Sequence, residues 1–206
     1  MSLFISFEGI DGCGKTTQLE LLASRALQRE YSLCRTREPG GTALAETIRH
    51  YLLHSSDALG AREELLLFGA ARAAHVSQVI RPALARGEIV LSDRFADSSV
   101  AYQGGGLGLN GSFIRAMNTF ATDELKPDIT FFLDIDPQLG QSRRAGEKAD
   151  RIEVRGIDFQ MRVRAAFLEI AKEEPQRFLV LNADQPREKL HAEIVDILSA
   201  RGLDLK

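Results

Sequence analysis

The feature that most constrains this chain is a glycine-rich stretch near its start, GIDGCGKT at residues 9–16. It follows a short apolar run at residues 3–7 and opens a segment of helical character at residues 15–30. Glycines let the backbone curl so that several N–H groups point at one anion, and a helix starting there adds a favourable dipole. Strand, loop and helix in this order are the context in which GxxxxGK[ST] binds nucleotide phosphates.

Apolar runs and helical segments alternate along the rest of the chain. Short apolar runs suit strands that are buried on both faces of a parallel sheet. The runs are at 3–7, 32–36, 89–92, 129–133 and 178–181, and the helical segments are at 15–30, 43–54, 62–85, 112–121, 157–174 and 186–200. This alternation predicts an α/β fold, with a doubly wound five-stranded parallel sheet and helices on both faces. The length favours one domain over residues 1–206.

Composition and charge argue against several classes of partner. The formal net charge is -3 and there is no basic tail, so bulk electrostatics give no reason to expect nucleic-acid binding. No apolar stretch approaches the roughly 20 residues of a membrane span, and no basic segment typical of a signal peptide is seen. Cys13 and Cys34 form neither a CxxC pair nor a metal-ligand cluster. We therefore expect a reduced, cytoplasmic protein without a membrane anchor.

Residues around the glycine-rich loop carry groups suited to a nucleotide and its metal ion. Lys15 can reach the β- and γ-phosphate oxygens, and the hydroxyl of Thr16 can bind Mg²⁺. Asp93 and Arg94 follow the third apolar run. An aspartate there can hold the ion through water, and an arginine can bind a second phosphate group. Taken alone, these two residues are equally consistent with a structural Asp-Arg pair.

A phosphate-binding loop does not by itself say what happens to the phosphate. A GTPase that acts as a switch usually carries an NKxD-like motif near the end of the sheet, which recognises the guanine base. The corresponding segment here, NADQ at residues 182–185, lacks the lysine. The switch is therefore disfavoured, whereas an ATPase or a module that acts through a protein partner stays an alternative.

Four further motifs occur in order after the loop. They are TREPGGT at 36–42, FGAAR at 68–72, DRF at 93–95 and AYQGGG at 101–106. In this arrangement the chain strongly resembles the bacterial thymidylate kinase family, from the first strand to the last helix. The resemblance implies a fold of the nucleoside monophosphate kinase type, Mg²⁺-dependent transfer from ATP to dTMP giving dTDP, and a homodimer. Another nucleotide or deoxynucleoside kinase is the nearest alternative. Two arginines that bind an acceptor phosphate, Arg49 and Arg94, would distinguish a nucleotide kinase from a nucleoside kinase. A nucleoside acceptor has no phosphate and needs no such pair.

The resemblance also assigns roles to individual residues. Phe68 matches the aromatic residue that stacks on thymine, and Arg72 matches the arginine that hydrogen-bonds a thymine carbonyl. On spacing alone, a core phenylalanine and a solvated arginine would explain both. Asp11 matches the acceptor of the sugar 3′-hydroxyl, and Tyr102 matches the tyrosine that crowds the 2′ position. The implied substrate set is Asp11, Arg37, Arg49, Phe68, Arg72, Arg94, Ser99, Tyr102 and Gln103; the implied ATP set is Gly9, Asp11, Gly12, Cys13, Gly14, Lys15, Thr16, Thr17 and Arg143.

A basic segment at about 141–153 is expected to form a lid over the two phosphates. It contains Arg143, Arg144, Lys148 and Arg151, although most such runs are only solvated connections. Some family members carry an arginine where this chain has Gly12, so the resemblance places the catalytic cation in the lid. Arg151 in DRIE matches best, which makes the predicted catalytic set Lys15, Arg94 and Arg151. No general base is expected, because the acceptor phosphate is already anionic.

Two local features complete the predictions. The Glu38–Pro39 peptide bond is expected to be cis, as in related kinases. Cys13 lies near a helix N-terminus, which can depress a thiol pKa. We therefore hypothesise that oxidation or alkylation of Cys13 blocks ATP binding, the alternative being that it is a small apolar filler.

Overall fold

The computed structural model describes residues 2–146 and 150–205. Five strands form one parallel sheet, and their order across the sheet is β2-β3-β1-β4-β5. The strands are β1 Leu3–Glu8, β2 Leu33–Arg37, β3 Ile89–Asp93, β4 Ile129–Asp134 and β5 Phe178–Asn182. β1 is central and has no exposed face, which explains its continuous apolar run. The predicted five-stranded parallel sheet is confirmed.

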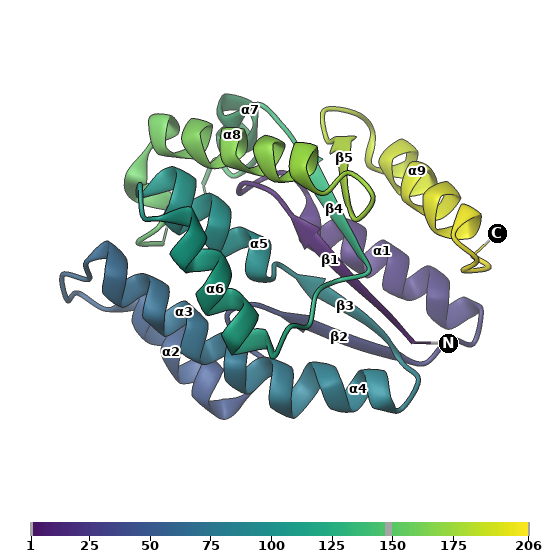
Figure 1. The fold of residues 1–206 in the computed structure, drawn as a ribbon. Helices are drawn as coiled ribbons and strands as arrows, with labels where there is room; N and C mark the ends of the chain where they lie inside the picture. The colour runs from purple at the N-terminus through teal and green to yellow at the C-terminus, as the bar shows by residue number, and fades with distance from the viewer. Residues whose placement is uncertain (1, 147–149, 206) are drawn as a thin grey trace.

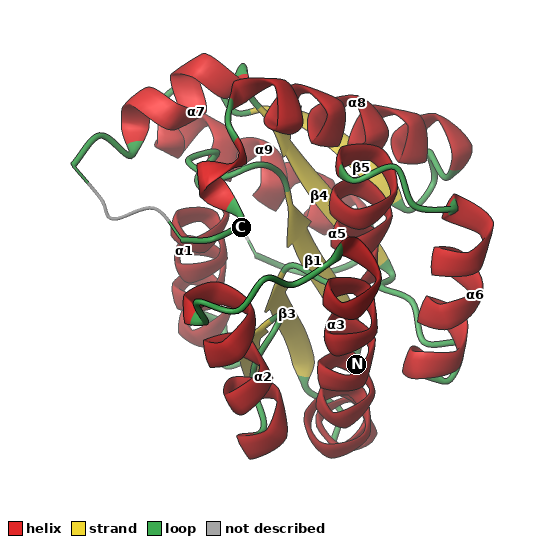
Figure 2. Cartoon of the chain, turned by 90° about the vertical axis from the view of Figure 1, so that its left-hand side faces the viewer, coloured by secondary structure: helices red, strands yellow, loops and turns green. Residues whose placement is uncertain are grey.

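Helices cover both faces of this sheet (Figure 1). α1 (Lys15–Gln28) and α9 (Arg187–Ala200) pack side by side on one face. The other face is covered by α3 (Ala61–His75), α4 (Arg81–Ala85), α5 (Ala96–Ser99), α6 (Gly111–Thr122) and α8 (Ile157–Glu173), and Figure 2 shows the sheet between the two layers. The remaining helices are α2 (Ala43–His54) and α7 (Pro137–Arg143), with a short 3₁₀ turn, η3, at Glu153–Arg155. No helix within the described ranges is both long and apolar enough to cross a membrane.

The helix predicted over residues 62–85 is interrupted. A π-helical turn, η1 (Val76–Ile80), separates α3 from α4. Pro82 lies just beyond this turn and has no N–H to donate to the preceding turn, and its ring would clash with a carbonyl of a regular α-helix. The wider turn is a way to accommodate such a residue without ending the helix.

Residues 96–106 form helix that the sequence did not indicate. α5 continues into a second π-helical turn, η2 (Val100–Gly106), although three consecutive glycines disfavour helix. Tertiary packing explains the difference. A Cβ on Gly105 would lie 2.4 Å from the Cβ of Ala166, and one on Gly106 would lie 2.4 Å from the Phe159 ring. The glycines let η2 approach α8 closely, and η2 carries two of the predicted substrate-binding residues.

Candidate active site

A cleft of about 770 Å³ opens at the carboxyl ends of the strands. Ligands of parallel α/β sheets bind at this edge, where the loops diverge to opposite faces. Of the predicted site residues, the cleft is lined by Asp11, Gly12, Gly14, Lys15, Thr16, Thr17, Arg37, Arg49, Phe68, Asp93, Arg94, Ser99, Tyr102, Gln103 and Arg143. Gly9, Cys13, Arg72 and Arg151 do not belong to its lining.

The glycine-rich loop forms the donor end of the cleft. α1 begins after Gly14, which has a left-handed backbone and gives the helix no side-chain cap, so the first N–H groups of α1 are available to an anion. The Lys15 ammonium donates to the carbonyl oxygens of Gly9 and Ile10, at 3.2 and 3.0 Å. These bonds hold the Lys15 ammonium against the loop, in the lining of the cleft.

Thr16 and Asp93 bring two oxygen ligands together. The Thr16 hydroxyl donates to a carboxylate oxygen of Asp93 at 2.7 Å, although the two residues lie far apart in the sequence. Hydroxyl and carboxylate oxygens suit Mg²⁺, which usually keeps several waters and phosphate oxygens as its other ligands. The donor set thus fits the predicted metal site.

The loop packs tightly against α7 at Gly12. Gly12 has φ of 79°, and a Cβ there would lie 2.1 Å from the carbonyl oxygen of Gly140. This position therefore has no room for a side chain next to α7. An arginine at position 12 would therefore displace the loop. The expectation that the catalytic cation comes from the lid fits this geometry but stays a prediction.

Arg94 connects the donor end to the acceptor end. Its guanidinium donates to Asp11 at 2.5 Å and to the Gly9 carbonyl at 2.8 Å, and it lies 5.0 Å from the centre of the Tyr102 ring. Burial alone would raise the pKa of Asp11, but the positive charges of Arg94 and Lys15 outweigh it and lower that pKa. Asp11 is therefore ionised at neutral pH and can accept a hydrogen bond from a ligand hydroxyl.

Three arginines converge beside this point. The pKa of Arg49 is lowered by burial and by the positive charges of Arg37 and Arg94. Arg49 donates to the Pro39 carbonyl at 3.1 Å, and Arg37 is paired with Glu46 at 2.9 Å. Mutual repulsion of neighbouring cations is relieved when an anion binds among them. This end of the cleft thus suits an anionic group such as an acceptor phosphate.

Phe68, Ser99, Tyr102 and Gln103 also line the cleft, whereas Arg72 does not belong to the lining. Arg72 is 1% exposed and is therefore not a solvated arginine. Its guanidinium donates to Ser99 at 3.1 Å and to Asn118 at 2.7 Å. The predicted contact between Arg72 and a base stays a prediction.

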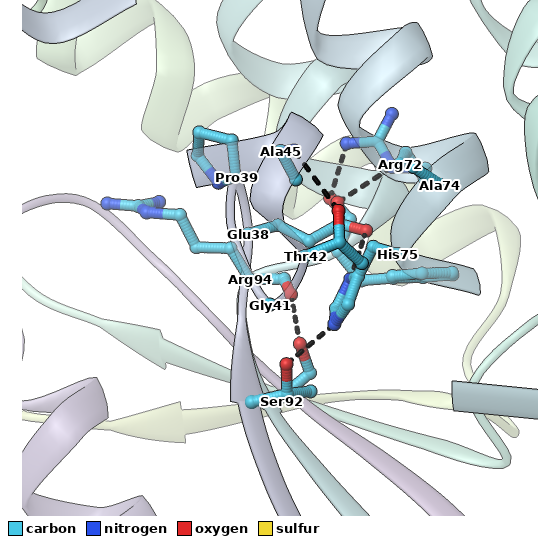
Figure 3. A network of polar contacts seen from close by, with 12 residues as sticks. Glu38, Pro39, Gly41, Thr42, Ala45, Arg72, Ala74, His75, Ser92 and Arg94 are labelled. Atoms are coloured by element: carbon cyan, nitrogen blue, oxygen red, sulfur yellow. Dashed lines mark hydrogen bonds and ion pairs between the residues drawn. The ribbon is translucent and has the colours of Figure 1, made fainter. Parts of the chain in front are cut away.

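A buried polar network supports Arg72 from behind (Figure 3). Glu38 accepts from the Nε of Arg72 at 2.8 Å, and its other carboxylate oxygen lies 3.1 Å from Nδ1 of His75. The opposite ring nitrogen of His75 lies 2.6 Å from the Thr36 hydroxyl. The Glu38–Pro39 peptide bond is cis, as predicted. Sequence reasoning found the TREPGGT motif but assigned no role to Glu38 or His75, because their contacts join this motif to α3, more than 30 residues away in the sequence.

The basic segment is anchored at both ends. Arg143 donates to the Ala183 carbonyl at 3.0 Å, and Arg144 is paired with Glu153. Arg151 donates to Glu64 and to the Leu52 carbonyl, both at 2.7 Å, and does not belong to the cleft lining. Its predicted catalytic role stays a prediction, whereas Arg143 and Arg144 line the cleft. Lys148 lies outside the described residues.

Two buried groups near the loop differ from expectation. Burial raises the pKa of the Cys13 thiol, and Cys13 is 1% exposed, so the expected depressed pKa is wrong. Glu8 was not identified from the sequence. Its carboxylate accepts from the Phe95 N–H at 2.7 Å and from the Ser98 hydroxyl at 2.6 Å. Burial and the nearby charge of Asp97 raise the pKa of Glu8 to about 8.

The fold and the site together define a class. A phosphate-binding loop, a magnesium-type oxygen pair and an arginine cluster share one cleft, which is the arrangement of a P-loop phosphotransferase with an anionic acceptor. Within the described residues no group of three or more histidine, cysteine, aspartate or glutamate side chains could hold a metal ion by itself.

Comparison with known proteins narrows this class. The thymidylate kinase family model matches residues 7–194. The chain is 50% identical to a thymidylate kinase of Bifidobacterium longum, covering 93% of this chain and 95% of the relative. It is 47% identical to a thymidylate kinase of Deinococcus radiodurans, with 97% and 98% covered. The crystal structure of thymidylate kinase from Ehrlichia chaffeensis is similar, with a TM-score of 0.78, 40% identity, and 96% and 98% covered. The chain therefore belongs to the thymidylate kinase family, the kinases that convert dTMP to dTDP.

Proposed function

We propose that this cleft transfers the γ-phosphoryl group of ATP to dTMP with Mg²⁺, by direct in-line displacement. The observation that carries the proposal is the position of Arg94. It contacts the glycine-rich loop through Gly9 and Asp11, and its charge also acts on Arg49 in the arginine cluster. One guanidinium thus lies between a donor-phosphate site and an acceptor-anion site, where the phosphoryl group would cross.

On the donor side, the loop N–H groups and Lys15 would hold the β- and γ-phosphates. Thr16 and Asp93 would hold Mg²⁺, which when bound neutralises charge on the phosphate oxygens. Arg143, beside Ala183, would border the adenine. Gly9, Cys13 and Thr17 would shape the loop and the first turn of α1.

On the acceptor side, Arg49 and Arg94 would bind the phosphate of dTMP, with Arg37 at the rim. Asp11 would accept from the sugar 3′-hydroxyl, which its ionised state allows. Tyr102 would limit space at the 2′ position, and Phe68 would stack on the base. No side chain needs to remove a proton, because the acceptor phosphate is anionic near neutral pH.

The segment at about 141–153 would act as the lid. Arg144 lines the cleft and contributes to the lowered pKa of Asp11, so a lid cation already acts on the acceptor end. For Arg151 to contribute to catalysis directly, it would have to leave Glu64 when both substrates bind. A lid of this kind excludes water and adds positive charge around the moving phosphoryl group.

A homodimer and a cytoplasmic location complete the proposal. α3 and α6 pack together, and they expose Leu66, Phe113 and Phe120. Large apolar side chains gathered on two adjacent helices are typical of a surface that binds another protein, here a second copy of this chain. Light scattering on a size-exclusion column should give twice the 22.7 kDa of one chain. A monomer at micromolar concentration would contradict the dimer.

The direct test of the reaction is ADP release with ATP and Mg²⁺, comparing dTMP, dUMP, thymidine and no acceptor. We expect rapid turnover with dTMP, and a loss of about 10³-fold in kcat for Arg94→Ala, as for other phosphoryl-transfer arginines. Arg86→Ala is a matched control, because Arg86 is exposed, pairs with the nearby Glu88, and lies at the opposite end of β3. Turnover with thymidine but not dTMP would contradict the acceptor assignments, and equal ADP release without an acceptor would indicate an ATPase.

A further inference from the structure

We call the part of the cleft lined by Phe68, Ser99 and Gln103 the base end, because the proposed function places the base there. Two neutral side chains of the base end each form a hydrogen bond with one buried charged residue. Ser99 and Gln103 line the cleft, whereas their partners Arg72 and Glu64 lie behind it. A hydroxyl or an amide can present either a donor or an acceptor to a ligand. A guanidinium can only donate, and a carboxylate can only accept. The charged partners therefore decide which group each neutral side chain presents to the cleft.

Glu64 determines the orientation of the Gln103 amide. The carboxylate accepts from the Gln103 amide nitrogen at 2.9 Å, and Glu64 is 0% exposed. Arg151 and Arg155 donate to its second oxygen at 2.7 and 2.5 Å, and Arg155 also donates to the oxygen that faces Gln103, at 3.1 Å. Burial alone would raise the pKa of Glu64, but hydrogen bonds from Arg155 and Gln103 and the two arginine charges lower it. Because Glu64 stays ionised, the amide nitrogen must face it, and the amide oxygen of Gln103 is directed elsewhere.

Arg72 determines the polarity of Ser99 in the same way. The arginine donates to the Ser99 oxygen at 3.1 Å, so this oxygen acts as an acceptor toward Arg72. The hydroxyl hydrogen of Ser99 then stays available, and among the described residues it has no acceptor within hydrogen-bond distance. Arg72 is itself fixed by Glu38 and Asn118, at 2.8 and 2.7 Å.

We propose that Glu64 is a specificity-determining positioning residue, which makes Gln103 an acceptor, while Arg72 makes Ser99 a donor. This inference rests on the proposed function. Thymine and uracil carry a carbonyl at position 4 beside an N3–H, so their edge offers an acceptor and a donor. The cleft offers the complementary pair. Cytosine carries an amino group at position 4 and an unprotonated N3, so both contacts would be mismatched.

The substitution Glu64→Gln should reverse the polarity. The new amide oxygen would take the position of the second carboxylate oxygen, because two arginine donors face that position and only the longer Arg155 contact faces the other. The new amide nitrogen would then face Gln103 and donate to it. Gln103 would have to turn its oxygen toward residue 64 and present its own nitrogen to the cleft, where it opposes the thymine N3–H.

The experiment compares kcat/KM for dTMP, dUMP and dCMP in the wild type and Glu64→Gln. We expect kcat/KM for dTMP and dUMP to fall about tenfold or more, with no fall for dCMP. The reason is that a buried polar group left without a hydrogen-bond partner weakens binding of the mismatched base. Glu64→Asp keeps an acceptor-only carboxylate and should keep the preference for dTMP over dCMP. Arg155→Gln is the matched control: it removes one partner of Glu64 but leaves the carboxylate facing Gln103, so the preference should be unchanged even if overall turnover falls.

The outcomes separate this inference from the proposed function. If the wild type does not phosphorylate dTMP, the proposed function fails. If it prefers dTMP over dCMP and Glu64→Gln lowers all three substrates equally, only the role of Glu64 is contradicted. Should Glu64→Gln lack a cooperative thermal transition, Gln103→Met decides instead. This variant removes the acceptor, so an unchanged preference over dCMP would overturn the inference, and a loss restricted to dTMP and dUMP would support it.

Discussion

The donor end and the base end of the cleft differ in how they are built. At the donor end, the lining residues 11, 12 and 14–17 lie close together in the chain, and the first N–H groups of α1 have no side-chain cap. At the base end, Phe68, Ser99 and Gln103 come from three separate elements. Buried charged residues behind the wall orient two of these side chains. In the proposed assignment, phosphate binding therefore needs a local loop conformation, whereas base recognition needs contacts between distant parts of the chain.

After the loss expected for Arg94→Ala, the next largest effect is expected at the donor end, where the loop packs tightly against α7. Gly12→Ala would place a Cβ 2.1 Å from the Gly140 carbonyl oxygen, so either the loop or α7 must shift. Because a displacement of about 1 Å at a reacting group can lower a rate 10²-fold, we expect a loss of about 10² in kcat/KM for ATP. Steady-state kinetics with varied ATP measures it.

Gly87→Ala is the control for that substitution. Gly87 has a similar φ of 81° but no atom near its missing Cβ, and it lies in the turn before β3. It should show the backbone strain without the clash, and therefore normal kinetics. If Gly12→Ala were equally active, the tight contact between the loop and α7 would not position the phosphates.

At the base end, Glu38→Gln tests the support of Arg72. The variant keeps an oxygen for one bond but removes the charge that pairs with a buried guanidinium. We expect a loss of about 1–3 kcal/mol in the free energy of unfolding, and a higher KM for dTMP with little change in the KM for ATP. Urea unfolding and kinetics with each substrate measure the two effects. Glu188→Gln, which breaks an exposed pair with Arg187, should change neither.

The same difference between the two ends decides what the sequence could predict. The sequence predicts the five strands, the glycine-rich loop and the place of Thr16, because each depends on residues close in the chain or on burial of a whole strand. The roles of Glu64 and His75 could not be predicted, because a buried glutamate or histidine on a helix has the same local sequence pattern as a solvent-exposed one. The π turn at Val76–Ile80 and the helical AYQGGG segment were also missed, since tertiary packing there overrides local propensity.

Glu8 lies between the two ends, and its titration gives a smaller effect that depends on pH. The pKa of Glu8 is about 8 in the folded state against 4.5 for an ordinary glutamate. Between these values the folded protein holds a proton that the unfolded chain releases, so raising the pH through this window lowers the stability. In the variant Glu8→Gln the amide cannot titrate, yet it can still accept from the Phe95 N–H and bond to Ser98.

Glu8→Gln should therefore gain stability relative to the wild type as the pH rises, by up to about 1.4 kcal/mol per pH unit, and the gain should level off above about pH 8. Urea unfolding of both proteins at pH 5, 6.5 and 8.5 measures the difference, in which the other titrating groups cancel. A difference that is constant with pH would mean that Glu8 is already ionised in the folded protein.

The smallest effect is expected at Cys13, although it lies inside the phosphate-binding loop. Its thiol is 1% exposed and its pKa is raised by burial, so little reactive thiolate forms. Cys34 is more exposed and provides a comparison within the same molecule. Iodoacetamide should modify Cys34 first in the folded protein, as measured by mass spectrometry. Cys13→Ala should keep kcat within about twofold, because the buried thiol itself faces no ligand and the loop backbone is left in place. Modification of Cys13 ahead of Cys34, with parallel loss of ATP binding, would show that the loop opens more readily than its packing against Gly140 implies.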